Sequence, residues 1–176
     1  IVGRRKRRIQ PLERFGRCAS FSTFGRVRSA FAHSIVGGGD IAILLCEPGW
    51  LWLIPLPGER VSVGLVERTP RAGTDAEETL MGCIEGSAFL SGTFAGAERI
   101  APFRRIANYS YYNLEPSSER VVSLGDARAF LDPIFSSGVT IAVLSARLLA
   151  REVALALSQE RPLGLEAYWS RCEIAY

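Results

Sequence analysis

The stretch from Gly125 to Val139, which reads GDARAFLDPIFSSGV, constrains the fold of this chain more than any other. It joins an apolar strand pattern at 121–124 to an apolar helical pattern at 140–157. A helix N-terminus offers unpaired backbone N–H groups and a partial positive charge, and a glycine there lets a ligand approach the backbone. Asp126, at the end of the strand pattern, can accept hydrogen bonds from sugar hydroxyls. The stretch therefore predicts a site for a nucleotide cofactor.

Several apolar strand patterns precede this stretch, at 18–25, 40–46, 49–56 and 60–67. Short links rich in proline and glycine join the last three, which predicts an antiparallel meander. Thr74 and Asp75 can cap a helix over roughly 76–90. Further strands are expected at 97–106 and 107–113, and a final helix at 165–176 that packs back on the body. Sheet, covering helix, then strand and long helix form an α+β pattern.

Composition indicates a globular protein, because 48% of the 176 residues are hydrophobic and 22% are charged. The net charge of +3 is unevenly placed, since five basic residues lie between Arg4 and Arg8. The rest of the chain has 16 basic against 18 acidic residues, a net charge of −2. A basic run can bind nucleic acid or act as a nuclear signal. Because no aromatic residues are interleaved with it, we expect a solvated or connecting segment and no nucleic-acid partner.

The cysteine and histidine content argues against several classes of site. His33 is the only histidine, which argues against a Ser-His-Asp hydrolase and against histidine metal sites. The four cysteines form no C-x-x-C pair, so we expect reduced thiols and no bound metal. Charged residues and prolines interrupt the longest apolar stretches, so no membrane span is predicted. We expect a soluble, cytoplasmic protein.

Two motifs carry a family resemblance. The stretch from Gly125 to Val139 resembles the second FAD-binding motif of the flavoproteins that include geranylgeranyl reductases, aromatic hydroxylases and flavin-dependent halogenases. Within it, the F-x-x-P-x-x-S-x-G pattern of the halogenase branch is matched by Phe130, Pro133, Ser136 and Gly138. The string GWLWLIP at 49–55 resembles the W-x-W-x-I-P signature of flavin-dependent halogenases, and RVSVGLV follows at 60–66. From about Cys18 onward, the chain resembles a flavin-dependent halogenase of the tryptophan halogenase-like family.

The resemblance implies an α+β fold truncated at its N-terminus. Residues 1–16 would be a basic connecting segment, 17–118 an antiparallel substrate-side sheet, and 119–176 the last strand and helix of an FAD-binding, Rossmann-like region of the monooxygenase type. The chain begins with Ile1 and shows no early G-x-G-x-x-G, since its only glycine cluster, Gly37–Gly39, is typical of a turn. We therefore expect a fragment that leaves an apolar face exposed. The dinucleotide-binding unit and the lysine that directs the oxidant would lie outside it.

The same resemblance implies a set of site residues. Those that would bind the cofactor are Gly125, Asp126, Pro133, Gly138 and Val139. The backbone N–H groups of Ser137 and Gly138 would hold a halide, and Val139 would face the pyrimidine edge of the flavin. Two structural alternatives stay open, in which Asp126 only caps a turn and Ser136 to Gly138 only cap the long helix. Asp132 is interpreted as structural, because Asp-Pro favours a turn.

The aromatic residues have a similar double interpretation. Trp50 and Trp52 are two positions apart and share one face of a strand, with Leu51 and Leu53 on the other. The indoles could fill a core between sheet and helix, whereas the resemblance implies that they lie near the flavin and keep organic substrate from it. The tyrosines of NYSYYN, at 108–113, are interpreted as packing near the flavin.

The function implied is that of an FAD-dependent halogenase using reduced flavin, O₂ and chloride or bromide. Phe135 stands where tryptophan halogenases carry a glutamate, which favours a phenol- or pyrrole-type aromatic substrate, free or tethered to a carrier protein. A flavin reductase would supply the reduced flavin. The alternatives are a reductase or hydroxylase of the geranylgeranyl reductase type, an inactive fragment, and a binding module that uses the basic arm.

Overall fold

The computed structural model describes residues 9–27, 39–68, 73–115, 117–118 and 121–173. The chain divides into two compact units, one formed by Gly16–Asn108 and the other by Ile1–Phe15 with Tyr109–Tyr176. The basic run at 4–8, His33 and the first two glycines of the 37–39 cluster lie outside the described residues.

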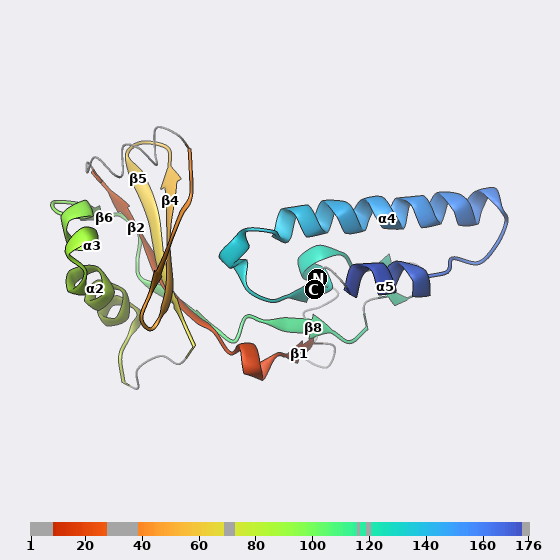
Figure 1. Ribbon diagram of the computed structural model, residues 1–176, viewed down its shortest axis with the longest axis horizontal. Helices are drawn as coiled ribbons and strands as arrows, with labels where there is room; N and C mark the ends of the chain where they lie inside the picture. The colour runs from red at the N-terminus through yellow and green to blue at the C-terminus, as the bar shows by residue number, and fades with distance from the viewer. Residues whose placement is uncertain (1–8, 28–38, 69–72, 116, 119–120, 174–176) are drawn as a thin grey trace. The chain divides into compact units, whose positions relative to one another are not determined.

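The unit of residues 16–108 is built on an antiparallel sheet with the strand order β3-β4-β5-β2-β6, in which β7 also pairs with β2 (Figure 1). The predicted meander of β3, β4 and β5 is confirmed. The strands are β2 (Cys18–Gly25), β3 (Ala42–Cys46), β4 (Gly49–Leu56), β5 (Arg60–Glu67), β6 (Glu98–Arg99) and β7 (Arg104–Ala107).

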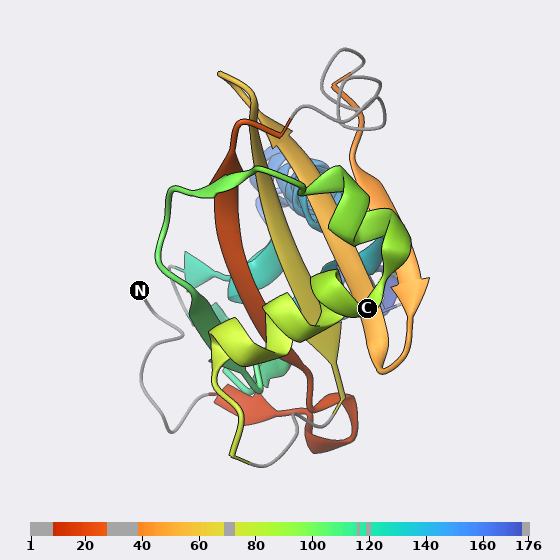
Figure 2. The ribbon, with the colours of Figure 1, turned by 90° about the vertical axis from the view of Figure 1, so that its left-hand side faces the viewer.

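Helices α2 (Ala76–Gly86) and α3 (Ala88–Thr93) lie across one face of this sheet (Figure 2). Asp75 caps α2, because its carboxylate accepts a hydrogen bond from the Glu78 N–H at 2.9 Å. The single helix predicted over 76–90 is wrong. Ser87 has an extended backbone and its hydroxyl accepts from the Leu90 N–H at 3.3 Å, so it ends α2 and caps α3.

The hydrophobic core of this unit lies between the sheet and the two helices. Leu51 and Leu53 of β4 are fully buried there against Leu80 and Ile84 of α2. Because side chains alternate along a strand, Trp50 and Trp52 lie on the opposite face of the sheet.

A single arginine fastens the start of α2 to the sheet. The Arg105 guanidinium donates to the hydroxyl of Ser20 at 3.0 Å, to the carbonyls of Thr74 and Asp75 at 2.6 and 2.8 Å, and to the Thr79 hydroxyl at 2.6 Å. One planar cation thus satisfies several oxygen atoms at the entry of the helix.

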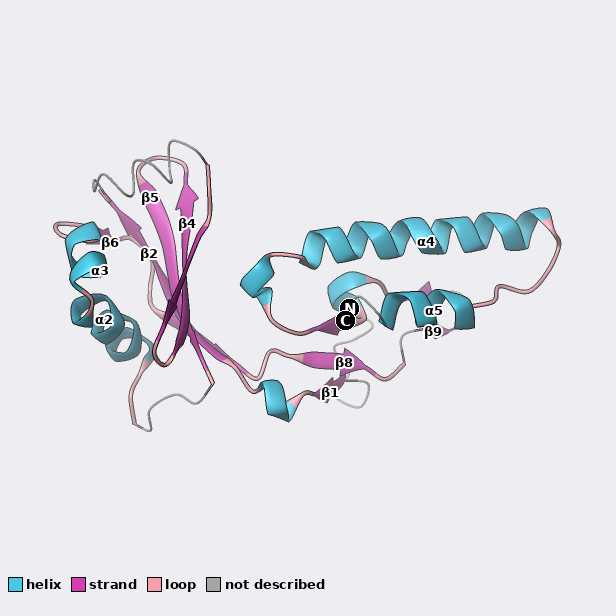
Figure 3. Ribbon diagram, in the orientation of Figure 1, coloured by secondary structure: helices cyan, strands magenta, loops and turns pink. Residues whose placement is uncertain are grey.

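The second unit combines short strands with the long helix (Figure 3). Its three-stranded antiparallel sheet has the order β1-β8-β11, and β9 pairs with β10. Its elements are β1 (Ile9–Pro11), η2 (Glu13–Phe15), β8 (Tyr111–Asn113), β9 (Ser117–Ser118), β10 (Val121–Val122), η3 (Gly125–Ala127), β11 (Ala129–Phe130), η4 (Pro133–Phe135), α4 (Gly138–Ser158) and α5 (Glu166–Glu173).

The buried strand predicted at 121–124 is wrong in its extent. Only Val121 and Val122 form a strand, and they pair antiparallel with Ser117 and Ser118. Val121 is exposed, because this short ribbon does not lie inside a larger sheet. The chain is thus a mixed α/β protein in which every strand pairing among the described residues is antiparallel.

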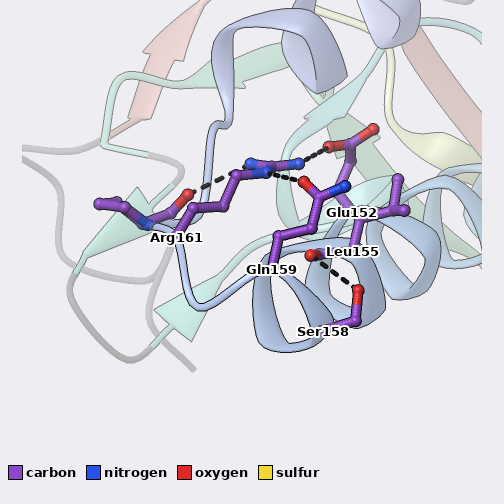
Figure 4. A network of polar contacts seen from close by, with 6 residues as sticks. Glu152, Leu155, Ser158, Gln159 and Arg161 are labelled. Atoms are coloured by element: carbon purple, nitrogen blue, oxygen red, sulfur yellow. Dashed lines mark hydrogen bonds and ion pairs between the residues drawn. The ribbon is translucent and has the colours of Figure 1, made fainter.

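Helix α4 ends in a network of polar contacts (Figure 4). The Arg161 guanidinium donates to the side-chain carbonyl of Gln159 at 2.9 Å and lies 3.6 Å from the Glu152 carboxylate. The Ser158 hydroxyl donates to the Leu155 carbonyl at 3.1 Å. These contacts satisfy groups at the last turn before the chain runs to α5, which contacts α4 as predicted.

Large apolar side chains remain exposed along α4. Val139 is 78% exposed and Leu157 is 75% exposed, and Val143 and Leu144 are also exposed. Among the described residues, no helix combines the length and the apolar character needed to cross a membrane.

Candidate functional site

A hollow of about 700 Å³ opens at the start of α4. Its walls come from η3, β11, η4 and the first turns of the helix, all within the second unit. Most of the predicted cofactor and halide residues line it, namely Asp126, Pro133, Ser137, Gly138 and Val139. Segments that follow one another in the sequence therefore fold around one open cavity.

The η3 turn lies against α4 because residue 125 is a glycine. Gly125 has a φ of +50°, a conformation that L side chains rarely adopt. A Cβ atom there would lie 2.8 Å from the Cβ of Ala142 in α4. Any larger residue would push the turn away from the helix.

The turn holds Asp126 by its backbone and leaves its side chain exposed. The Tyr111 hydroxyl of β8 donates a hydrogen bond to the Asp126 carbonyl at 2.6 Å. A Cβ atom on Gly138, the first residue of α4, would lie 3.6 Å from Oδ1 of Asp126. The structure thus brings the predicted carboxylate and the predicted glycine together at the helix N-terminus.

The η4 turn redirects the chain into α4. Asp132 has a structural role, as predicted: it caps this turn, because its Oδ1 accepts from the Ile134 N–H at 3.1 Å. Ser136 follows in the left-handed region with a φ of +51°, and its N–H donates to the Pro133 carbonyl at 2.9 Å. No local pattern predicts this left-handed serine.

Ser137 occupies the N-cap position of α4, but its hydroxyl makes no capping hydrogen bond. The first backbone bond of the helix runs from the Ile141 N–H to the Ser137 carbonyl at 2.9 Å. In the described part of the chain, the N–H groups of Ser137 and Gly138 donate to no backbone carbonyl. Ser137 therefore stands at the N-cap without a side-chain cap, and both residues line the hollow.

Two tyrosines support the wall formed by β11. The Tyr109 ring lies edge-on to the Phe130 ring with centroids 5.8 Å apart, and Tyr111 is the register partner of Phe130. Burial raises the pKa of the Tyr111 phenol, and the nearby Asp126 raises it further. Tyr111 therefore keeps the proton that it donates. Sequence reasoning treated it as packing only, because nothing in the local pattern pairs it with Asp126.

The two tryptophans belong to the other unit. Trp50 and Trp52 of β4 contact each other with ring centroids 6.0 Å apart. The core between sheet and helices takes Leu51 and Leu53 instead, so the alternative in which the indoles fill that core is wrong.

Each indole has a different environment. The Trp52 N–H donates to the Ser62 hydroxyl at 3.2 Å, and the ring occupies the space above Gly64, where a Cβ atom would clash with it at 2.1 Å. Trp50 is 4% exposed, and its N–H has no hydrogen-bond partner among the described residues.

Among the described residues, no group of three or more His, Cys, Asp or Glu side chains is placed to hold a metal ion. All four cysteines are free thiols.

Comparison with known proteins agrees with this geometry. The sequence profile of a family described as tryptophan halogenase matches residues 44–175. A 1H-pyrrole-2-carbonyl peptidyl-carrier protein chlorinase from Pseudomonas fluorescens is 34% identical over 107 residues, which cover 59% of this chain and 24% of the relative. A tryptophan 2-halogenase from Chondromyces crocatus is 30% identical over 158 residues, which cover 86% of this chain and 30% of the relative.

Solved structures of halogenases are similar to this chain. A myxobacterial chondrochloren halogenase, described as a variant of the FAD-dependent halogenases, superposes with a TM-score of 0.75 at 28% identity. The superposition covers 94% of this chain and 38% of the halogenase chain. The chain thus spans between 24% and 38% of the length of these relatives. Halogenases of this kind are FAD-dependent enzymes of the oxidoreductase type that use halide. With its profile match and its shared fold, the chain belongs to the tryptophan halogenase family of flavin-dependent halogenases.

Proposed function

We propose that this chain is part of an FAD-dependent halogenase that acts on a phenol- or pyrrole-type aromatic substrate. One observation carries the proposal: in a member of the halogenase family, the Asp126 carboxylate and the unpaired amides of Ser137 and Gly138 line one hollow at the start of a long helix. A polar anchor and an anion site therefore lie side by side.

The residues around the hollow fit FAD. Asp126 is exposed and its backbone is fixed by Tyr111, so the carboxylate is free to accept hydrogen bonds from the ribitol hydroxyls. Pro133 and Val139 offer apolar contact to a flat ring system. When bound, FAD would supply the redox chemistry of the reaction, and the protein would supply orientation and exclusion of water.

A halide fits the amide donors at the start of α4. The helix N-terminus favours an anion, and the N–H groups of Ser137 and Gly138 can donate to it. Apolar side chains in the same wall would strip water from the ion, which is costly unless these donors compensate. Those side chains are Phe130, Ile134 and Phe135.

Trp50 and Trp52 are proposed to keep the organic substrate away from the flavin. The contact between the rings and the fit of Trp52 over Gly64 make the pair a bulky, fixed obstacle on one sheet face. In this proposal the oxidant travels to a lysine outside this chain. Residues 17–118 would form the substrate side and residues 119–176 the end of a Rossmann-like FAD region, with 1–16 as a connecting segment.

The substrate class rests on two supports. Phe135, which is 86% exposed, stands where tryptophan halogenases carry a glutamate. A relative that is 34% identical is named a chlorinase of a pyrrole group held on a peptidyl-carrier protein. We therefore propose an aromatic substrate tethered to a carrier protein, with a flavin reductase as partner and the cytoplasm as the site of action.

The test uses the full-length protein with reduced FAD, O₂ and either chloride, bromide or no halide. Free and carrier-bound phenols and pyrroles are offered, and the halogen isotope pattern of the product is read by mass spectrometry. Halogenated product that requires both flavin and halide would support the proposal. Equal substrate oxidation with and without halide would favour the reductase or hydroxylase alternative, and FAD binding without any turnover would favour an inactive protein.

A further inference from the structure

The side chain of Asn113, at the end of β8, is fully buried, although asparagine is found mostly at protein surfaces. Its amide nitrogen can donate two hydrogen bonds and its amide oxygen can accept two. Burying such a group costs free energy unless it is hydrogen-bonded. The partners of this side chain therefore show what the position requires.

The amide nitrogen of Asn113 reaches both sides of the turn that carries Asp126. Nδ2 donates to the Ala127 carbonyl at 3.2 Å and to the Ser123 hydroxyl at 3.5 Å. Ala127 is the last residue of η3, and Ser123 lies two positions before its first residue, Gly125. Gly125 and Asp126 therefore lie between the two points of the chain that one side chain holds.

The amide oxygen of Asn113 fixes the orientation of the same side chain. Oδ1 accepts from the Glu115 N–H at 3.1 Å, which is the Asx-turn arrangement. A carbonyl oxygen only accepts and a backbone N–H only donates. Turning the amide over would therefore place its oxygen against the Ala127 carbonyl and its nitrogen against the Glu115 N–H. Only one orientation satisfies both ends of the amide, and in it the donors face the η3 turn.

The backbone of Asn113 is fixed by Arg128, the residue that follows η3. The Asn113 N–H donates to the Arg128 carbonyl at 2.8 Å, and its carbonyl accepts from the Arg128 guanidinium. The guanidinium carbon lies 5.8 Å from the ring centre of Tyr112 and 5.1 Å from that of Trp169 in α5. Asn113 is thus held at both its backbone and its side chain, so the turn that it binds is held in one position.

Tyr111 and Asn113 act on the turn from one face of β8. The two residues are two positions apart in the strand, so their side chains lie on the same face. The Tyr111 hydroxyl donates to the Asp126 carbonyl, and the Asn113 amide donates to the next residue, Ala127. Together they fix the backbone of the turn and leave the Asp126 carboxylate at the wall of the hollow.

We propose that Asn113 is a positioning residue of the cofactor site, whose side chain holds η3 so that the Asp126 carboxylate meets the ribitol hydroxyls of FAD. This inference rests on the proposed function, because it takes Asp126 to bind FAD. Asn113 is not among the residues that line the hollow, so it acts through the turn and not by contact with the cofactor. A carboxylate already held in place loses little conformational freedom on binding, and this is the affinity that Asn113 contributes.

The experiment is a double-mutant cycle on the full-length protein, in which the dissociation constant of FAD is measured by fluorescence titration. The four proteins are the wild type, Asn113→Ala, Asp126→Ala and the double variant. Asn113→Ala should weaken FAD binding about tenfold. In the Asp126→Ala background, the same change should weaken it less than about twofold. An effect exerted through Asp126 disappears once that carboxylate is absent, whereas general damage to the fold would remain.

Ser22→Ala is the matched control. It also removes a buried side-chain bond, that of the Ser22 hydroxyl to the Ala101 carbonyl at 2.8 Å, but in the 16–108 unit. Its FAD affinity should equal that of the wild type. Ser123→Ala tests the same amide from the other partner, and it removes one oxygen atom, so it keeps the cycle available if Asn113→Ala fails to fold. It should weaken FAD binding about threefold in the wild type and not in Asp126→Ala.

The outcomes separate this inference from the proposed function. If Asp126→Ala weakens FAD binding but Asn113→Ala binds as tightly as the wild type, the inference is overturned and the cofactor site stands. Losses that add in the double variant would overturn it in the same way, because Asn113 would then act on the fold in general. Unchanged affinity in Asp126→Ala would overturn the proposed cofactor site, and this inference with it.

Discussion

The Tyr111 hydroxyl donates to the backbone carbonyl of Asp126 at 2.6 Å, which ties strand β8 to the η3 turn. Removing one such bond costs about 1 kcal/mol, so Tyr111→Phe should lower the free energy of unfolding by that amount. FAD should bind several-fold more weakly to the full-length variant, because the turn that holds Asp126 is less fixed. Fluorescence titration with FAD and urea unfolding measure the two effects.

Tyr112→Phe is the control for this prediction. The Tyr112 ring lies 5.8 Å from the Arg128 guanidinium carbon, and phenylalanine keeps that ring. The pKa of Tyr111 is raised above its usual 10. The hydrogen bond of its hydroxyl therefore contributes its full stability below pH 10. That stability is lost only as the pH rises through the higher pKa of the folded state. Equal FAD affinity in both variants and the wild type would remove Tyr111 from the support of the site.

Asp126→Ala should weaken FAD binding to the full-length protein by about 1.5–3 kcal/mol, the usual range for hydrogen bonds to a charged group. The fold should be unaffected, because the Asp126 backbone and not its side chain accepts the bond from Tyr111. Asp126→Asn should lose less, since the amide oxygen still accepts. FAD affinity unchanged in Asp126→Ala would exclude the carboxylate from the cofactor site.

Gly125→Ala should destabilise the protein by about 1–3 kcal/mol, because it combines a left-handed backbone with a Cβ atom that would lie 2.8 Å from Ala142. Gly138→Ala is the matched control, since its new Cβ would meet Asp126 at an ordinary 3.6 Å. Ala142→Gly should recover part of the loss in a double variant. Denaturant unfolding of the four proteins checks this, and equal stability of the two alanine variants would contradict it.

Replacing Trp50 or Trp52 by phenylalanine should affect stability differently but affect function in the same way. Trp52→Phe loses the bond to Ser62 and should cost about 1 kcal/mol, whereas Trp50→Phe loses no hydrogen bond recorded in the described structure. In the full-length enzyme, both should retain FAD while halogenation falls or peroxide release rises. If both variants melt much earlier and keep full specific activity, the tryptophans serve packing alone.

Gly138→Pro should abolish halide-dependent turnover of the full-length enzyme, because proline removes an amide donor at the start of α4. The first helical position tolerates proline well, so a melting curve should show the helix retained. Ser137→Ala should be milder, since its N–H remains and its hydroxyl caps nothing. Turnover of Gly138→Pro that still responds to chloride or bromide would place the halide elsewhere.

Local patterns determined much of the fold. The strands at 18–25, 49–56 and 60–67 match their predicted bounds, because period-two alternation and turn residues act within a few positions. The long helix, predicted from 140 to 157, runs from Gly138 to Ser158. Asp75 caps its helix and Asp132 stabilises its turn as expected, because each carboxylate acts on an N–H group two or three residues away.

Other predictions failed where one local signal competed with another. Ser87 can cap a new helix as well as sit inside one, and it divides the helix predicted at 76–90. The pattern at 121–124 is apolar, yet only its first two residues find a partner strand. An apolar run becomes a buried strand only where neighbouring strands exist to pair with it.

By itself, the sequence determined the strands, the caps, the FAD-type motif and the faces of Trp50 and Trp52, because each depends on residues close together in the chain. Only the tertiary structure decided which distant groups meet. Tyr111 reaches Asp126 through the register of β8 with β11, and Arg105 of β7 reaches the start of α2 because that helix packs on the sheet. Such contacts depend on strand register and helix packing, and these are settled by burial of the whole core rather than by any local pattern.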